Sequence, residues 1–162
     1  MKNNWAKTIL YVYKYLDRVC EGIDSLVEQN ALNSFYYGQN RSDNEVLSVA
    51  ERISKLCERK AKLINIKVLV DDCLLKSDEM NAQLLIERYI DDDNSENIAL
   101  RHGLNIRTYF RKINQAETSF STFMIREGFT EDKLDKYLQG ENWITEVCQK
   151  FRDESEKEVE LV

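Results

Sequence analysis

The sequence predicts an all-α fold, with a long N-terminal antiparallel helical hairpin followed by a C-terminal helical domain. Among the 162 residues there is no proline and there are only 5 glycines, so little forces the backbone out of long helices. Apolar residues recur at alternating steps of four and three, which is the spacing of a helix with one buried face. Short segments rich in Asn, Asp and Gly interrupt these stripes and indicate where helices end.

The first helix is predicted at about residues 4–30. Its apolar stripe consists of Trp5, Ile9, Val12, Leu16, Val19, Ile23 and Leu26. Residues 31–43 break the pattern and predict a loop. A second long helix is predicted at about residues 44–77, with a stripe of Val46, Val49, Ile53, Leu56, Leu63, Val70 and Leu74.

Lys60 and Lys67 interrupt the second stripe, so the pattern does not indicate an ideal coiled coil. Either helix alone would leave a large apolar strip in water, and two antiparallel helices that bury their stripes together are the simplest solution. We therefore expect residues 1–78 to form a helical hairpin that serves for oligomerisation or partner binding.

Residues 79–152 are predicted to form a second domain of shorter helices. A helix at 80–90 is expected to end at the aspartates 91–93. A later helix, from about 106 to 127, has the stripe Tyr109, Ile113, Ala116, Phe120 and Phe123. The predicted N-caps are Asn94, Asn105 and Thr130, and the predicted helix-ending glycines are Gly103, Gly128 and Gly140.

The net charge of −6 argues at first against nucleic acid, but most of it lies near the C-terminus. In residues 118–162, eleven acidic residues against six basic ones give −5. We expect residues 153–162 to be a loosely ordered acidic tail. The remainder of the chain is close to neutral, which leaves room for a local basic face.

The sequence predicts no enzyme. It contains no nucleophile elbow, no phosphate-binding glycine loop and no paired-carboxylate signature, so no catalytic residue is assigned. The four cysteines are scattered and are expected to be reduced thiols, with no metal and no cofactor bound. His102, the only histidine, is expected to cap or pack at a helix end.

Neither a membrane span nor a secretory signal is recognisable, so we expect a cytoplasmic protein without a membrane partner.

Residues 95–113 have the pattern of a helix-turn-helix. Such a motif needs a small residue where its helices cross, a glycine in the turn and apolar residues on both inner faces. Ala99, Gly103, Leu104, Tyr109 and Ile113 supply these in order. The second helix of the motif enters the major groove, and its first turns contact base edges and phosphates.

The predicted second helix carries side chains suited to that contact. Arginine pairs bidentately with guanine, and Asn or Gln pairs with adenine. Threonine and lysine suit phosphate oxygens. The candidate DNA-binding residues are Arg107, Thr108, Arg111, Lys112, Asn114 and Gln115.

Residues 82–117, including the segment Glu87-Arg-Tyr-Ile-Asp-Asp, resemble the region-4 helix-turn-helix of bacterial sigma factors, which reads the promoter −35 element. The chain also resembles small phage-type late-gene regulators of the ArpU-like and RinA-like groups, which have helical material before such a motif. The resemblance implies that Arg107, Thr108, Arg111 and Lys112 contact DNA. A sigma region 2 is not recognisable before the motif, so a complete sigma factor is not expected.

Two functions remain open. The first is a DNA-binding transcriptional regulator of phage or mobile-element origin, whose partners are double-stranded DNA and RNA polymerase. A homodimer would suit a palindromic operator, although the interrupted second stripe does not require one. The second is a non-catalytic protein-interaction module that binds RNA polymerase or a sigma factor without touching DNA, a reading favoured by the overall acidity and by Phe110 near the groove-facing surface.

Overall fold

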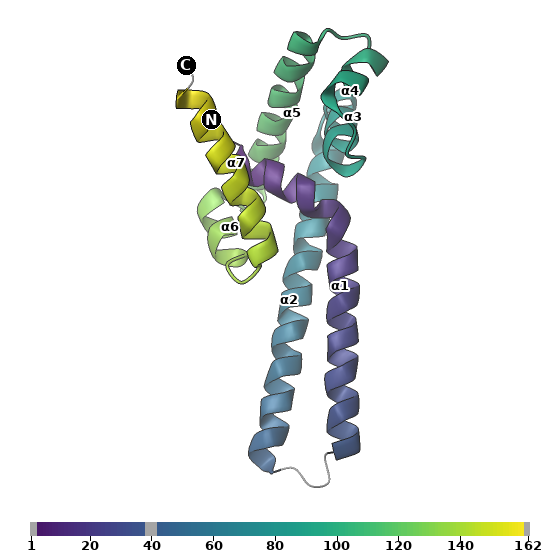
Figure 1. Ribbon diagram of the computed structural model, residues 1–162, viewed down its shortest axis with the longest axis vertical. Helices are drawn as coiled ribbons and strands as arrows, with labels where there is room; N and C mark the ends of the chain where they lie inside the picture. Colours follow the sequence, from purple (N-terminus) through teal and green to yellow (C-terminus); the bar gives the residue numbers. More distant parts are fainter. Residues whose placement is uncertain (1–2, 38–41, 161–162) are drawn as a thin grey trace. The chain divides into compact units, whose positions relative to one another are not determined.

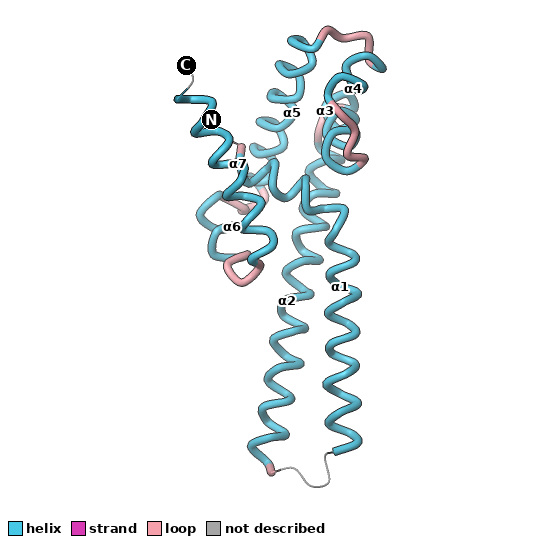
Figure 2. The backbone as a smooth tube through the Cα atoms, in the orientation of Figure 1, coloured by secondary structure: helices cyan, strands magenta, loops and turns pink. Residues whose placement is uncertain are grey.

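The computed structural model describes residues 3–37 and 42–160, and all regular structure within these ranges is helical (Figures 1 and 2). The prediction of an all-α fold is therefore confirmed. None of the described helices contains a stretch that is long and apolar enough to cross a membrane. The elements are α1 (Asn4–Tyr37), α2 (Asp43–Lys76), α3 (Glu79–Leu85), the π-helix η2 (Ile86–Ile90), α4 (Ser95–Arg101), α5 (Ile106–Arg126), α6 (Glu131–Tyr137) and α7 (Asn142–Glu160).

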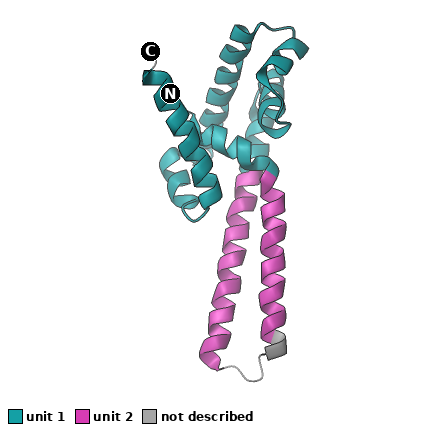
Figure 3. Ribbon diagram, in the orientation of Figure 1, with its two compact units in different colours: residues 1–14, 68–162 teal, residues 15–67 magenta. Residues whose placement is uncertain are grey.

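The chain divides into two compact units, which Figure 3 colours separately. One contains residues 15–67, and the other combines residues up to Lys14 with residues 68–162. The expected division between residues 78 and 79 differs from this one, because the start of α1 belongs to the unit of shorter helices. Trp5 is 1% exposed and its Nε1 donates to Asp135 Oδ1 on α6 at 2.9 Å, while Asn3 Nδ2 donates to Thr118 Oγ1 on α5 at 2.9 Å.

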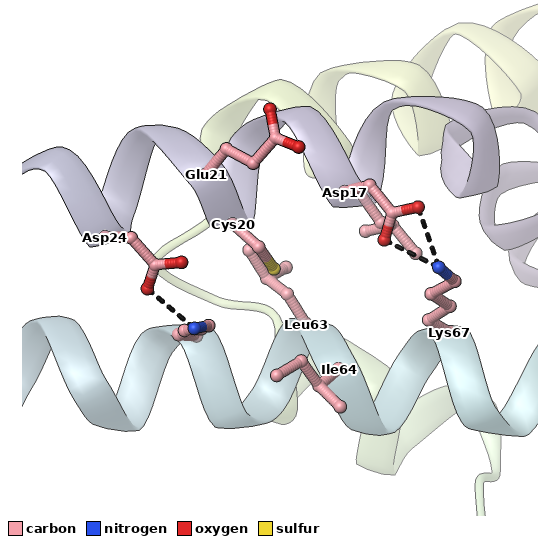
Figure 4. Close-up of a pocket in the computed structure, with 9 residues that line it drawn as sticks. Asp17, Cys20, Glu21, Asp24, Leu63, Ile64 and Lys67 are labelled. Atoms are coloured by element: carbon pink, nitrogen blue, oxygen red, sulfur yellow. Dashed lines mark hydrogen bonds and ion pairs between the residues drawn. The ribbon is translucent and has the colours of Figure 1, made fainter.

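In the unit of residues 15–67, charged pairs connect α1 and α2 (Figure 4). Lys67 Nζ donates to Asp17 Oδ1 at 2.6 Å, and Lys60 Nζ donates to Asp24 Oδ1 at 2.6 Å. The two lysines that interrupt the stripe of α2 thus contact acidic residues of α1. Asp17, which precedes Asp24 on α1, pairs with Lys67, which follows Lys60 on α2. The paired segments of α1 and α2 therefore run in opposite directions. The buried apolar residues are Leu16, Ile23, Val49, Leu63 and Ile66.

Two features of this unit differ from the expectation. Helix α1 continues to Tyr37 rather than ending near residue 30, because neither glycine nor proline occurs between 31 and 37. Residues 38–41 of the expected loop lie outside the described residues.

Leu26 and Val46 belong to the predicted stripes but are 44% and 45% exposed. Because each helix has one neighbour here, side chains at the flank of a stripe remain in contact with solvent.

In the unit of shorter helices, α3 and α4 contact α5. The predicted stripe of α5 is buried from Tyr109 to Phe120, and Met124 continues it while Phe123 is only half-buried. The predicted N-caps are confirmed: side-chain oxygens of Asn94, Asn105 and Thr130 accept the backbone N–H three residues later.

Two of the three predicted helix-ending glycines adopt the left-handed conformation typical of that role. Gly103 follows α4 with φ 66° and Gly128 follows α5 with φ 90°. Helix α6 already ends at Tyr137, with Leu138 as its C-cap, so Gly140 lies beyond the end of the helix.

Residues 153–160 of the expected acidic tail have a helical backbone. Helix α7 continues to Glu160, and residues 161–162 lie outside the described part of the chain. One face of this helix is attached to α1: Ser155 Oγ donates to Asn4 Oδ1 at 3.2 Å, and the Phe151 ring meets the Tyr11 ring edge-on at 6.3 Å. These contacts and the absence of glycine and proline after Gly140 account for the continuation of the helix.

Candidate nucleic-acid interface

The start of α5 is fixed by local backbone chemistry. Gly103, in the left-handed conformation, reverses the chain after α4, and the N–H of Leu104 bonds back to the carbonyl of Ala99 at 2.8 Å. Asn105 then caps α5, since its Oδ1 accepts the N–H of Thr108 at 2.8 Å. Ile98 and Tyr109 are both 0% exposed and anchor α4 and α5 in the same core.

The structure brings four of the six predicted DNA-binding residues together on the solvent side of α5. These four are exposed, and with 3.6 residues per turn they project away from the buried Tyr109 and Ile113. They are Arg107, Arg111, Asn114 and Gln115, which we call the outer face of α5. Thr108 and Lys112 are half-buried and lie at its edge, beside the outer face rather than within it.

The segment that carries the outer face is locally basic. Residues 95–115 contain four basic residues and the single acid Glu96. Because Arg101 is paired with Glu87 and Asp93, Arg107, Arg111 and Lys112 against Glu96 leave +2, in a chain of net charge −6. A negatively charged ligand is therefore attracted to this segment even though the whole protein is acidic.

Comparison with family models, with curated proteins and with solved structures finds no match to the chain.

Behind this segment, a network of charged groups fastens α4 to η2. Glu87 is 5% exposed, and its two carboxylate oxygens contact consecutive residues: Arg101 Nη1 at 2.8 Å and His102 Nε2 at 2.6 Å. Arg101 Nη2 also donates to Asp93 at 2.6 Å. Burial opposes ionisation of Glu87, but hydrogen bonds from His102, Arg101 and Gln83 outweigh it and lower the pKa of this carboxyl. His102 thus occupies the C-cap of α4, in keeping with its expected place at a helix end.

A second buried carboxylate, Glu117, lies on the inner side of α5. It is 3% exposed and its Oε1 accepts the Tyr89 hydroxyl at 2.5 Å. Burial raises the pKa of Glu117, although the Tyr89 hydrogen bond and the charges of Lys7 and Arg88 act in the opposite direction. Glu117 therefore holds its proton more tightly in the folded chain than in water.

Sequence reasoning missed Glu87 and Glu117. A signal was present in both cases, because Glu87 lies between the buried Leu84 and Tyr89, and Glu117 adjoins the buried Ala116 on the predicted stripe. An acidic residue placed on an apolar face indicates a buried hydrogen-bonded carboxylate. What the sequence could not supply was the partner, since Tyr89 is 28 residues away from Glu117 along the chain.

Exposed apolar side chains occur on α5 beside the outer face and also on α4. Leu100 is 82% exposed, Phe110 49% and Ile106 43%. Ile106 and Phe110 are four residues apart and therefore share one side of α5. Phe110 lies beside the outer face of α5 rather than at its centre.

Proposed function

We propose that this chain is a DNA-binding transcriptional regulator in which α4 and α5 form a helix-turn-helix and α5 enters the major groove of duplex DNA. The observation that carries the proposal is the outer face itself: Arg107, Arg111, Asn114 and Gln115 are exposed together, opposite the buried side of the same helix. The cap at Asn105 and the core contact of Tyr109 hold the first turns of α5 in place. A preorganised helix of this kind loses little entropy on binding.

The side chains of the outer face suit base edges. Arg107 and Arg111 offer bidentate donors to the O6 and N7 atoms of guanine, and Asn114 and Gln115 offer the paired donor and acceptor that adenine requires. Thr108 and Lys112, at the edge of the face, are placed for phosphate contacts that set the register of the protein on DNA. The major groove, about 12 Å wide, accepts a single α-helix.

Residues 15–67 would then serve as the partner-binding part of the regulator. In this proposal their two segments act as the antiparallel hairpin that the stripes predict, and the exposed Leu26, Val46 and Leu47 leave apolar surface on them. A second copy of the chain, or RNA polymerase, would bind this surface. A homodimer would place two copies of α5 on the two halves of a palindromic operator.

The test is a DNA-binding measurement on a double variant. DNA fragments that bind the purified protein are first selected from genomic DNA, and binding is then measured by gel shift. Arg107→Ala with Arg111→Ala should weaken binding to the selected site by about tenfold or more, because each lost bidentate contact is worth about 1–3 kcal/mol. Lys136→Ala with Lys150→Ala, which removes the same charge from exposed residues of α6 and α7, is the matched control. Equal binding by the wild type and the outer-face variant, both folded by circular dichroism, would refute the assignment.

The exposed Leu100, Ile106 and Phe110 favour the second candidate, a protein-interaction module that binds RNA polymerase or a sigma factor. Apolar side chains of this kind are typical of the centre of a protein interface. The two candidates differ at low salt. A DNA-binding regulator retards DNA strongly there, whereas an acidic interaction module leaves DNA unbound at every salt concentration.

A further inference from the structure

A polar groove of about 590 Å³ lies between α3 and α5, next to the outer face. Both helices belong to the unit of shorter helices, where they contact each other. Every side chain that lines the groove is polar and none is acidic, although the chain has 29 acidic residues. The lining residues are Asn81, Arg111, Asn114, Gln115, Thr118 and Ser119. The groove is therefore suited to a hydrophilic ligand with negative charge.

Two of the lining side chains have donors that the fold does not use. Asn81 and Ser119 are half-buried, and neither side chain hydrogen-bonds to any residue in the described part of the chain. By contrast, Thr118 Oγ1 donates to the carbonyl of Asn114 at 2.9 Å and accepts from Asn3 Nδ2 at 2.9 Å. Outside the outer face, Asn81 and Ser119 are thus the donors of the groove that remain available to a ligand.

The position of Ser119 connects the groove to the proposed DNA contact. Ser119 follows Lys112 by close to two helical turns, so it lies on the same edge of α5 as Lys112 and Thr108. From Arg107 to Gln115 the helix advances about 12 Å at 1.5 Å per residue, which equals the width of the major groove. Ser119 lies about 6 Å further along, where a helix laid across the major groove meets the sugar–phosphate backbone at its border.

We propose that the groove between α3 and α5 binds the sugar–phosphate backbone at the border of the major groove, with Asn81 and Ser119 donating to phosphate oxygens. The inference rests on the proposed function, since it names a further part of the DNA that the same side of α5 contacts. Serine and asparagine are among the side chains that commonly bond to DNA phosphates. A concave polar surface beside a convex helix also fits the shape of duplex DNA, whose backbone forms a ridge along the major groove. These neutral donors hold α5 in register on DNA but add no sequence preference.

The test is a gel shift with the full chain on the selected duplex and on a scrambled duplex, at several salt concentrations. Asn81→Ala with Ser119→Ala should weaken binding of both duplexes by a similar factor of about tenfold, because two neutral hydrogen bonds are lost. The slope of the logarithm of affinity against the logarithm of salt concentration should keep its wild-type value, since a neutral donor releases no counterion. Gln139→Ala with Asn142→Ala, which removes two exposed amides outside the groove, should bind like the wild type.

A second measurement locates the contact on the DNA. Methylphosphonate linkages, which remove the charge and one oxygen of a single phosphate, are placed in turn along the selected duplex. At the phosphate that the groove holds, the substitution should weaken binding of the wild type but have little effect on Asn81→Ala with Ser119→Ala, because that contact has already been lost. Equal losses for the two proteins at every position would overturn the proposal.

Three results of the gel shift would also overturn it: wild-type affinity of the folded groove variant, a loss confined to the selected duplex, or an altered salt slope. Arg107→Ala with Arg111→Ala, measured beside the groove variant, separates this inference from the proposed function. If the arginine variant is weakened while the groove variant is not, the assignment of the groove alone fails. If both variants bind DNA like the wild type, the DNA-contacting side of α5 is wrong and both proposals fail.

Discussion

The Nε2 atom of His102 lies 2.6 Å from Oε2 of Glu87, and this contact joins the end of α4 to the π-helical turn η2. The other oxygen of Glu87 accepts a hydrogen bond from Arg101, so the last residue of α4 and its C-cap hold one buried carboxylate. α4 leads directly into the turn that starts α5. The contact between His102 and Glu87 therefore helps to position α5, the helix that we propose to contact DNA, although neither His102 nor Glu87 lies on the outer face.

Glu87 should make the folded state sensitive to acid. Its pKa is lowered in the folded chain, so the unfolded chain binds a proton more readily. Its stabilising contribution is therefore complete above its ordinary pKa of 4.5 and is lost as pH falls below that value. Urea unfolding of Glu87→Gln should show lower stability at neutral pH and a smaller loss of stability between pH 5 and acid than the wild type. Glu146→Gln, an exposed acid on α7, should retain the wild-type slope.

Glu117 should change the free energy of unfolding with pH in the direction opposite to Glu87. Its pKa is raised by burial, so the folded chain binds the proton more tightly, and the free energy of unfolding should fall as pH rises above 4.5 toward the folded pKa. Glu117→Gln removes this effect and should flatten that part of the stability curve. The same urea series checks it. A variant whose stability still declines with pH like the wild type over this range would show that another group is responsible.

The apolar periodicity and the cap residues predicted where most helices begin, but not the full length of α1 or the π-helical turn η2. Steps of three and four placed the buried stripe of α5, and Asn94, Asn105 and Thr130 were recognisable as caps because capping depends on residues three positions apart. The outer face followed from the same periodicity, since residues opposite a buried stripe are exposed.

What could not be predicted depends on contacts between distant segments. Trp5 lies on the same stripe as Leu16 and Ile23, yet it packs beside α6, and no local pattern distinguishes the two environments. The helical backbone of α7 beyond residue 152 could not be predicted for the same reason, because its contact between Ser155 and Asn4 joins distant parts of the sequence. The partners of Glu87 and Glu117 likewise became visible only in three dimensions.

Gly103 offers a direct test of the turn before α5. Its φ of 66° is strained for any residue with a Cβ, but an added Cβ would meet no atom within 4 Å. Gly103→Ala should therefore destabilise the fold by about 1 kcal/mol through backbone strain alone. Gly22→Ala is the matched control, because Gly22 lies inside α1 with equally open space and an ordinary helical φ, and it should stabilise by about 0.5–1 kcal/mol. If Gly103→Ala and Gly22→Ala changed the free energy of unfolding equally in denaturant melts, the inferred backbone strain at Gly103 would be wrong.

The position of Lys112 at the edge of the outer face predicts a distinct effect on DNA binding. A lysine that contacts a phosphate releases a counterion, so the logarithm of affinity falls with the logarithm of salt concentration by about 0.9 for each such contact. Lys112→Ala should reduce that slope by about 1 and weaken every DNA sequence by a similar factor. Arg107→Ala, which removes a base contact, should instead weaken the selected site more than unrelated DNA. Gel shifts at several salt concentrations, on selected and scrambled duplexes, measure both quantities. If Lys112→Ala changed the sequence preference while Arg107→Ala changed only the slope, α5 would lie in the groove rotated from the orientation that its buried side implies.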